Sequence, residues 1–256
     1  MKVYCCQLDI QWENKKANFV KARAMLEAQK PEAESLVLLP EMFAVGFSMN
    51  VGALAEPPGA ETEQFLSSTA RELNIYLMGG AVGTGRGTRG RNEAVVFTPQ
   101  GQLLARYCKL QPFTLGGESQ NYDAGDSVSL FSWHGFSVAP FICYDLRFPE
   151  LFRAAVRRGA NVMTVIANWP VTRIHHWIAL LQARAIENQA YVVGVNRCGN
   201  DPKLSYNGRS LIVHPRGDIL ADAGNREGIV AADLNFNELN TYRSELPFLK
   251  DIRPDF

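Results

Sequence analysis

The 256-residue sequence lacks an excess of charge of either sign, because its 26 lysine and arginine residues equal its 26 aspartate and glutamate residues. That balance gives no electrostatic reason to expect a nucleic-acid partner or an anionic membrane surface. The sequence also lacks an apolar run of about 18 residues, the length that would suggest a membrane span. Asp9 and Glu13 come too early for the apolar core of a signal peptide.

Cysteine and histidine are scarce and show no metal-binding spacing. The five cysteines contain no C-x-x-C pair and are odd in number, which disfavours a disulfide framework. They are Cys5, Cys6, Cys108, Cys143 and Cys198. The four histidines form no H-E-x-x-H motif, and no Cys/His ligand spacing is present. We therefore expect a soluble cytoplasmic protein with reduced thiols and no metal.

Hydrophobic residues make up 46% of the chain, enough for a substantial core. Short apolar runs predict strands at 2–10, 35–39, 75–83, 92–99, 101–108, 128–131, 136–142, 161–168, 191–197 and 228–234. The segment 209–223 is also predicted to be β-rich, with a Pro-Arg-Gly turn after His214. Helical spacing predicts helices at 14–30, with Asn14 as cap, and at 62–73, 149–158 and 175–189. A polar, glycine-containing loop is expected at 111–126. No repeat or linker appears, so the pattern predicts one α/β domain in which helices cover a pair of mixed sheets.

The segment ICYDLRFPE ends an apolar strand at Cys143 and places charged residues directly after it. Pro149 suits the first turn of a helix, so Cys143 is expected at a strand-to-helix connection. Backbone N–H groups and a helix terminus there favour a thiolate. A buried, inert thiol is the alternative, because free cysteine is among the most often buried residue types.

Two acidic residues and one lysine occupy comparable places. Glu41 directly follows the apolar run LVLLP, where burial would raise its carboxyl pKa and suit it to proton transfer. Lys109 follows the strand QLLARYC, and Glu118 lies in the loop beyond it. Taken alone, each of the three is compatible with a solvated surface position, and for Lys109 the sequence favours that interpretation.

The segments LVLLPEMF, YCKLQPF and ICYDLRFPE occur in this order and resemble the signature segments of the nitrilase superfamily of carbon–nitrogen hydrolases. The resemblance extends over nearly the whole chain, and ANWPVTRIHHWIALLQARAIENQAYVVGVNRCG and GRSLIVHPRGDIL are similar to the ω-amidase branch. It implies a single-domain, four-layer α-β-β-α sandwich over residues 1–256, paired into a homodimer and without a cofactor. The segment 110–113 departs from the His-Leu-Phe-like segment of many relatives. In the family that loop borders the substrate pocket.

The resemblance also implies a role for each residue. Cys143 would attack an amide carbonyl, and Glu41 would move protons during acylation and deacylation. Lys109 and the backbone N–H of Tyr144 would stabilise the tetrahedral oxyanion. Glu118 would hold Lys109 or the substrate amide in position.

The activity implied is hydrolysis of the terminal amide of a short dicarboxylate monoamide, such as 2-oxoglutaramate, through a cysteine thioester. Arg173 is the candidate for binding the free carboxylate, since arginine can engage a carboxylate through two hydrogen bonds. Phe43, Phe113 and Trp169 are candidates for lining the pocket. Arg147 is expected to brace the turn after the nucleophile through an ion pair.

Three alternatives remain at this stage. Another nitrilase-superfamily reaction on a nitrile, carbamoyl group or other amide would use the same three catalytic residues. A cysteine hydrolase of isochorismatase type would need an aspartate after the first strand, where Asp9 stands. A non-catalytic scaffold is disfavoured by the intact Glu41, Lys109 and Cys143 set.

Overall fold

A computed structural model describes residues 1–253, so residues 254–256 of the predicted domain lie outside the described part. The first of two large sheets has the strand order β15–β1–β2–β3–β4–β5, and β6 pairs with β4. Its strands are β1 (Lys2–Gln7), β2 (Leu36–Leu38), β3 (Tyr76–Thr84), β4 (Gly90–Phe97), β5 (Leu103–Cys108), β6 (Tyr122–Asp123) and β15 (Gly228–Asp233). β1, β2 and β3 are parallel, whereas β3, β4 and β5 are antiparallel.

The second sheet has the order β14–β13–β10–β9–β8–β7. Its strands are β7 (Phe131–Trp133), β8 (Phe136–Ile142), β9 (Val162–Ala167), β10 (Tyr191–Asn196), β13 (Leu211–Val213) and β14 (Ile219–Asp222). The central strands β8, β9 and β10 are parallel. A separate hairpin consists of β11 (Cys198–Asn200) and β12 (Ser205–Asn207).

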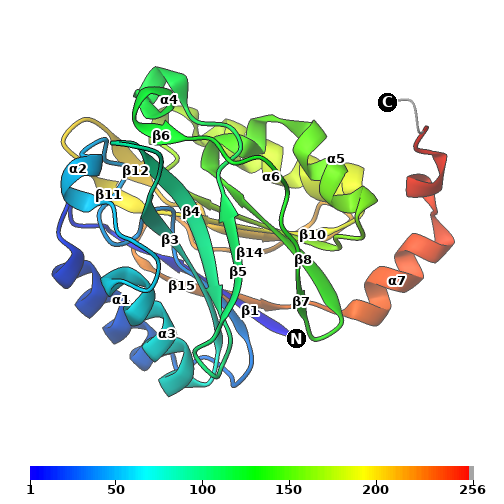
Figure 1. Ribbon diagram of the computed structural model, residues 1–256. Helices are drawn as coiled ribbons and strands as arrows, with labels where there is room; N and C mark the ends of the chain where they lie inside the picture. Colours follow the sequence, from blue (N-terminus) through cyan, green and yellow to red (C-terminus); the bar gives the residue numbers. More distant parts are fainter. Residues whose placement is uncertain (254–256) are drawn as a thin grey trace.

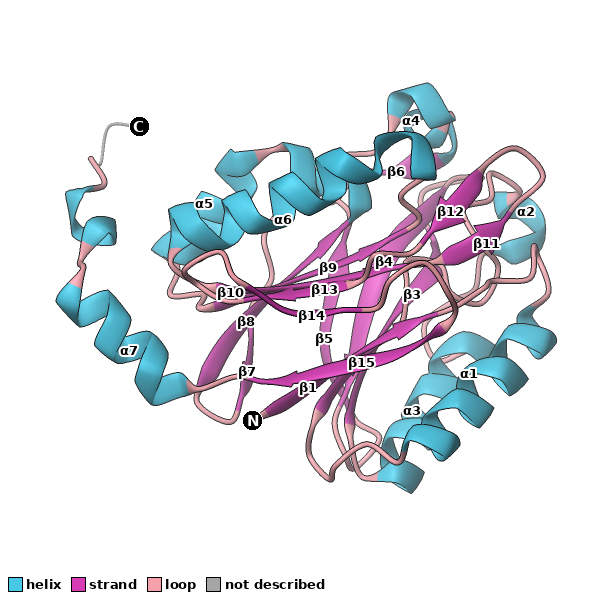
Figure 2. Cartoon of the chain, turned by 180° about the vertical axis from the view of Figure 1, so that it is seen from behind, coloured by secondary structure: helices cyan, strands magenta, loops and turns pink. Residues whose placement is uncertain are grey.

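The two sheets pack face to face, and helices cover both outer faces (Figure 1). Alternate residues of β1 show why: Val3 and Cys5 belong to the core between the sheets, whereas Tyr4 and Cys6 face the helix layer. That layer contains α1 (Lys15–Gln29) and α3 (Glu61–Leu73). On the other side, α5 (Pro149–Arg157) and α6 (Ile174–Asn188) cover the second sheet (Figure 2). The predicted four-layer α-β-β-α arrangement is confirmed.

Several local predictions are also confirmed, and others need correction. Asn14 caps α1, its side chain accepting a hydrogen bond from the Ala17 N–H. The strand predicted at 128–131 is wrong, because β7 begins only at Phe131. There the positive φ of both His134 (44°) and Gly135 (86°) makes a two-residue turn that pairs β7 with β8.

Short helices and the carboxy-terminal arm were not predicted. The loop at 111–126 contains η1 (Thr114–Gly116) and α4 (Glu118–Asn121), and α2 (Val51–Leu54) lies in an earlier loop. α7 (Phe236–Glu245) and η4 (Phe248–Asp251) form an arm at the side of the sandwich (Figures 1 and 2). The sequence signal for α7 is weak because it buries only Leu239 and Tyr242.

Candidate active site

The strand directions bring the site residues to one end of the sandwich. In the first sheet, β2 and β5 run in the same direction and β4 runs against them. Glu41 just after β2, Lys109 after β5 and Asn92 near the start of β4 therefore lie at one edge. In the second sheet, Cys143 follows β8 and Asn168 follows the parallel strand β9. Ligand sites commonly lie beyond the carboxyl ends of parallel strands.

Glu41 is completely buried and both of its carboxylate oxygens accept hydrogen bonds. Oε1 accepts from Lys109 Nζ at 2.9 Å and from Asn92 Nδ2 at 2.7 Å. Oε2 accepts from the backbone N–H of Asn168 at 2.8 Å and from Asn168 Nδ2 at 3.2 Å. The two sheets are thus joined through this carboxylate.

The charge state of Glu41 differs from the expectation based on burial alone. Burial acts to raise its pKa, as predicted from the sequence. The Lys109 ammonium and the hydrogen bonds from Asn92 and Asn168 outweigh it, so the pKa lies below its ordinary value. Glu41 is therefore an ionised carboxylate near neutral pH, ready to accept a proton.

Lys109 lies between two carboxylates and is only 1% exposed. Besides its bond to Glu41, its Nζ donates to Glu118 Oε2 at 2.8 Å and Oε1 at 3.1 Å. Burial acts to lower the pKa of Lys109, but Glu118 and Glu41 raise it well above its ordinary value. Lys109 is thus a fixed cation.

Glu118 is buried as well, so the solvated interpretation of this loop residue is wrong. Its Oε1 accepts from Asn92 Nδ2 at 2.7 Å, and its Oε2 accepts from the backbone N–H of Phe113 at 2.6 Å. Glu118 therefore fixes the Lys109 ammonium and also anchors the loop that carries Phe113.

Cys143 begins η2 (Cys143–Arg147) with a φ of 45°, a left-handed conformation that is uncommon for a residue with a side chain. Its side chain reaches a cavity of about 410 Å³ that Lys109 and Asn168 also line. Burial and the Glu41 carboxylate raise the pKa of the thiol well above its ordinary value, whereas Lys109 opposes that rise. The resting residue is consequently a thiol beside an ionised carboxylate.

Aromatic and cationic side chains form one part of the cavity wall. Phe113, Tyr144 and Trp169 line it, together with Arg147 and Arg173. The Arg147 guanidinium lies 4.7 Å from the centre of the Trp169 ring, and that of Arg173 lies 5.7 Å from the centre of the Phe113 ring. These residues form an aromatic part of the wall that carries two guanidinium groups, and Asp201 and Lys203 line the cavity elsewhere.

Arg147 does not make the predicted ion pair: within residues 1–253 no carboxylate lies within salt-bridge distance of it. Its Nη2 instead lies 3.3 Å from His176 Nδ1. Burial and the neighbouring Arg173 lower the pKa of Arg147. Within this part of the chain the Arg147 guanidinium thus has no carboxylate partner, although Asp201 also lines the cavity.

Phe43 is the predicted pocket residue that the structure places elsewhere. Its side chain is fully buried in the core between the first sheet and the helices, tilted against Phe19 and Phe65. The residue two positions after Glu41 thus faces the helix layer. Sequence reasoning also missed Asn92 and Asn168, whose N–H groups donate to Glu41, and Asn168 does so from the second sheet.

Among the described residues, no cluster of three or more histidine, cysteine, aspartate or glutamate side chains could hold a metal ion. Within the same part of the chain, no helix has the length and apolar character needed to cross a membrane. All five cysteines are free thiols.

Comparison with known proteins agrees with the fold and identifies the family. The family model for carbon–nitrogen hydrolases matches residues 2–244. The chain is 35% identical to a 2-oxoglutaramate amidase of Bacillus subtilis, covering 99% of this chain and 98% of that protein. It is 33% identical to the omega-amidase YafV of Escherichia coli K12, over 98% and 96%.

A crystal structure of a CN-hydrolase superfamily protein from Xanthomonas campestris superposes with a TM-score of 0.93 at 30% identity, covering 99% of this chain and 97% of that one. That protein carries an arsenic adduct in its active site. The chain belongs to the carbon–nitrogen hydrolase family, as the sequence segments predicted.

This membership excludes the isochorismatase-type alternative. Asp9, which that alternative would require, is not among the residues that line the cavity. Its side chain is 52% exposed and lies 3.7 Å from Arg197. The Glu41 segment, which that alternative leaves unexplained, forms the centre of the site.

Proposed function

We propose that this enzyme hydrolyses the terminal amide of a short dicarboxylate monoamide, of which 2-oxoglutaramate is the model substrate. One observation carries the proposal: a buried Glu41–Lys109–Glu118 cluster and the Cys143 thiol meet at a cavity whose wall carries two arginines. The names of the Bacillus subtilis and Escherichia coli relatives support the substrate class.

In the acylation step, Cys143 Sγ attacks the amide carbonyl carbon while its proton passes to Glu41. The Lys109 ammonium and the backbone N–H of Tyr144 stabilise the oxyanion that forms. Collapse of the tetrahedral intermediate breaks the C–N bond. The proton held by Glu41 goes to the departing nitrogen, so ammonia leaves and a Cys143 thioester remains.

In the deacylation step, Glu41 takes a proton from water, and the resulting hydroxide attacks the thioester carbonyl. Breakage of the C–S bond returns the proton to Cys143 and releases the dicarboxylate. Glu118 keeps the Lys109 ammonium in place throughout, because both of its oxygens bind Nζ.

Arg173 and Arg147 bind the carboxylate at the far end of the substrate. Both guanidinium groups line the cavity, and their planar donors suit a carboxylate. Phe113 and Trp169 hold the carbon chain between the carboxylate and the amide, while the two guanidinium groups rest against their rings. Substrate length is set by the distance from this clamp to Cys143.

The test compares 2-oxoglutaramate with a neutral amide and a nitrile of equal chain length by measuring ammonia release. Arg173→Ala should lower kcat/KM for the acidic amide at least tenfold, since a lost bond to a charged group costs about 1.5–3 kcal/mol. The same change should alter the neutral amide less than twofold. Arg86→Ala, on an exposed residue outside the cavity, is the matched control.

Equal losses on both amides would remove Arg173 from the carboxylate site. Faster turnover of the nitrile would replace amide hydrolysis with nitrile hydrolysis. Absence of any preference for the acidic amide in the wild type would contradict the substrate class.

We also propose a cytoplasmic homodimer. The five free thiols support a reducing compartment, and the family resemblance supports the dimer. Light scattering on the purified chain should give twice the 28.4 kDa mass of one copy. A mass of one copy at micromolar concentration would contradict the dimer.

A further inference from the structure

One buried carboxylate beside the site has no place in the mechanism above. Asp145 lies in η2, two residues after Cys143, and is fully buried without lining the cavity. Its Oδ2 accepts from the backbone N–H of Ile142 at 2.9 Å and from the Tyr107 hydroxyl at 2.8 Å. Its Oδ1 accepts from the backbone N–H of Gln111 at 2.9 Å.

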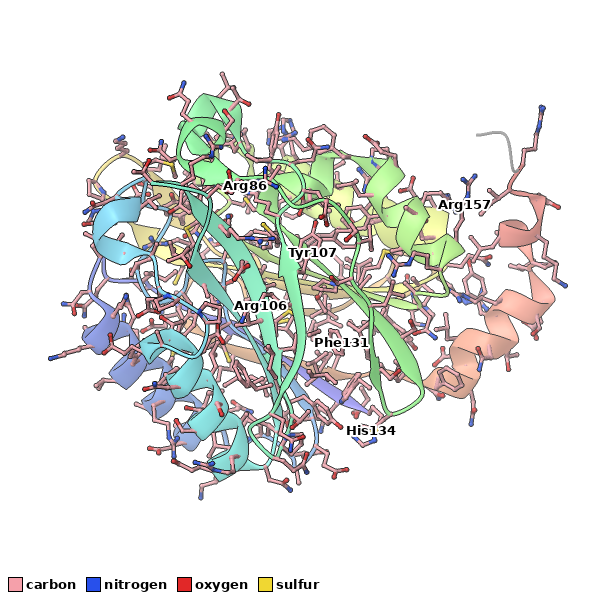
Figure 3. All side chains as sticks on the ribbon, viewed as in Figure 1. Arg86, Arg106, Tyr107, Phe131, His134 and Arg157 are labelled. Atoms are coloured by element: carbon pink, nitrogen blue, oxygen red, sulfur yellow. The ribbon has the colours of Figure 1, made fainter. Side chains whose placement is uncertain are left out.

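These three bonds link the segments of two site residues that lie on different sheets. Tyr107 and Gln111 stand two positions before and two positions after Lys109, so one carboxylate holds both sides of the lysine. Tyr107 lies on β5 in the core between the sheets (Figure 3). Ile142 directly precedes Cys143 and belongs to the second sheet.

The Ile142 bond also spans the left-handed residue. Cys143, with a φ of 45°, lies between the donor at 142 and the acceptor at 145. Such a conformation costs free energy for a residue with a side chain, and it persists only where its surroundings enforce it. The Asp145 carboxylate is one such constraint.

We propose that Asp145 is a positioning residue whose ionised carboxylate holds the Cys143 turn against the Lys109 strand, so that enzyme with a protonated Asp145 is poorly active. The inference rests on the roles proposed for Cys143 and Lys109. A protonated carboxyl group would bring a fourth hydrogen to a place where three donors already converge. Even where the Tyr107 hydroxyl reverses to accept that hydrogen, the neutral group accepts the two backbone N–H bonds less strongly than a carboxylate does.

The surroundings of Asp145 place its titration in an accessible range. Burial raises its pKa to about 6, opposed by Lys109 and by the three hydrogen-bond donors. Other titratable groups surround Asp145. On β5 and at its end they are Tyr107, Cys108 and Lys109, and within η2 they are Cys143 and Arg147. From α6, His176 contacts Arg147, and Arg184 donates to the Leu146 carbonyl. The pKa of Glu41 is lowered from 4.5, so Glu41 does not account for a loss of activity near pH 6.

The first variant is Asp145→Asn, which keeps the volume but sets an amide N–H₂ against one of the three donors. We expect kcat at pH 8 to fall at least tenfold, about 1.4 kcal/mol in the barrier. KM should change less than twofold, because Asp145 does not line the cavity. The loss of kcat between pH 7 and pH 5 should disappear, since the variant has no proton to gain there.

The second variant, Tyr107→Phe, keeps the carboxylate and both backbone bonds. The Tyr107 hydroxyl lowers the pKa of Asp145, so its removal should move the acid limb of kcat to higher pH by about half a unit or more. His176→Gln is the matched control, because His176 contacts Arg147 and has a pKa lowered from 6.5. Its acid limb should stay where the wild-type limb lies.

A measurement without substrate separates this inference from the proposed function. Lys109 lowers the pKa of the Cys143 thiol, so a displaced Lys109 should slow alkylation of Cys143 by N-ethylmaleimide. We expect Asp145→Asn to slow it at least threefold at pH 8, measured on the Cys143 peptide by mass spectrometry. If the wild type hydrolyses no amide but Asp145→Asn is still alkylated more slowly than the wild type, the proposed amidase activity is refuted and the positioning role of Asp145 is retained. An acid limb that persists at its wild-type pH in both Asp145→Asn and Tyr107→Phe, with unchanged alkylation of Cys143, would overturn the inference even in an active amidase.

Discussion

Replacing Lys109 by methionine tests the charge balance of the site directly. The methionine side chain has nearly the same shape as that of lysine but carries no charge, so the cation between Glu41 and Glu118 is lost. Both carboxylates then remain buried, joined only through Asn92 Nδ2. Breaking a buried ion pair by removing one partner typically costs about 3–5 kcal/mol, and we expect a loss of unfolding free energy in that range at pH 8.

The pH dependence of that loss follows from the causes acting on Glu41. In the wild type its pKa lies below 4.5, so its stabilising contribution is present above that pH and is lost as pH falls through the lowered value. Without Lys109, burial is the largest remaining cause and raises the pKa. In Lys109→Met, the contribution of Glu41 to stability is therefore lost as the pH rises through this raised pKa. The loss of unfolding free energy in Lys109→Met should therefore become smaller as the pH falls. It should shrink by about 1.4 kcal/mol for each pH unit over which one carboxylate is protonated in the folded variant but not in the unfolded chain.

The assay is urea unfolding of both proteins at pH 5 and pH 8, with turnover measured in parallel. Lys203→Met is the matched control: Lys203 also lines the cavity but is exposed, and its effect should stay within about 0.5 kcal/mol. We also expect kcat to fall by a hundredfold or more in Lys109→Met, roughly the effect of losing one oxyanion donor. A penalty of the same size at both pH values would refute the argument that Lys109 keeps Glu41 ionised.

Three further substitutions test individual residues. Cys143→Ala should abolish turnover while keeping the unfolding midpoint, and wild type trapped with substrate should show an acyl adduct on Cys143 by mass spectrometry; substantial activity in the variant would contradict the mechanism. Glu41→Gln should slow both half-reactions, with kcat lower by roughly 10²–10⁴ as is typical for a lost acid–base group; turnover within tenfold of wild type would assign proton transfer elsewhere. Phe43→Ala should lower the unfolding free energy by about 3–5 kcal/mol with KM unchanged, because Phe43 is a core residue; a raised KM in a stable protein would return it to the pocket.

The sequence predicted the site residues that follow an apolar strand. The runs before Glu41, Lys109 and Cys143 are short and end in a polar or reactive residue, so local pattern alone placed each at a strand end. The family resemblance then indicated that these three residues act together in one site. Glu118 depended on that resemblance entirely, because its burial comes from contacts with Lys109 and Asn92.

Other features depend on contacts that no local pattern encodes. Asn92 meets Glu41 across 51 positions and Asn168 meets it across 127, and either asparagine alone looks like an ordinary loop or strand-end residue. The lowered pKa of Glu41 could not be foreseen because it results from these partners outweighing burial. Phe43 was misplaced for a related reason: its position near the base in sequence gave no information about which side of the turn it faces.

The protonation states at rest constrain how the proposed reaction starts. Cys143 is a thiol of raised pKa, and Glu41 is a carboxylate of lowered pKa whose two oxygens already accept four hydrogen bonds. Transfer of the proton in the empty site is therefore uphill, since it weakens those bonds and creates a buried thiolate. The transfer becomes favourable only when a C–S bond forms and the charge moves to an oxygen near Lys109. Burial and the Glu41 carboxylate thus outweigh Lys109 and keep the free thiol protonated, which is why thiol reagents should label Cys143 slowly although it lines a cavity.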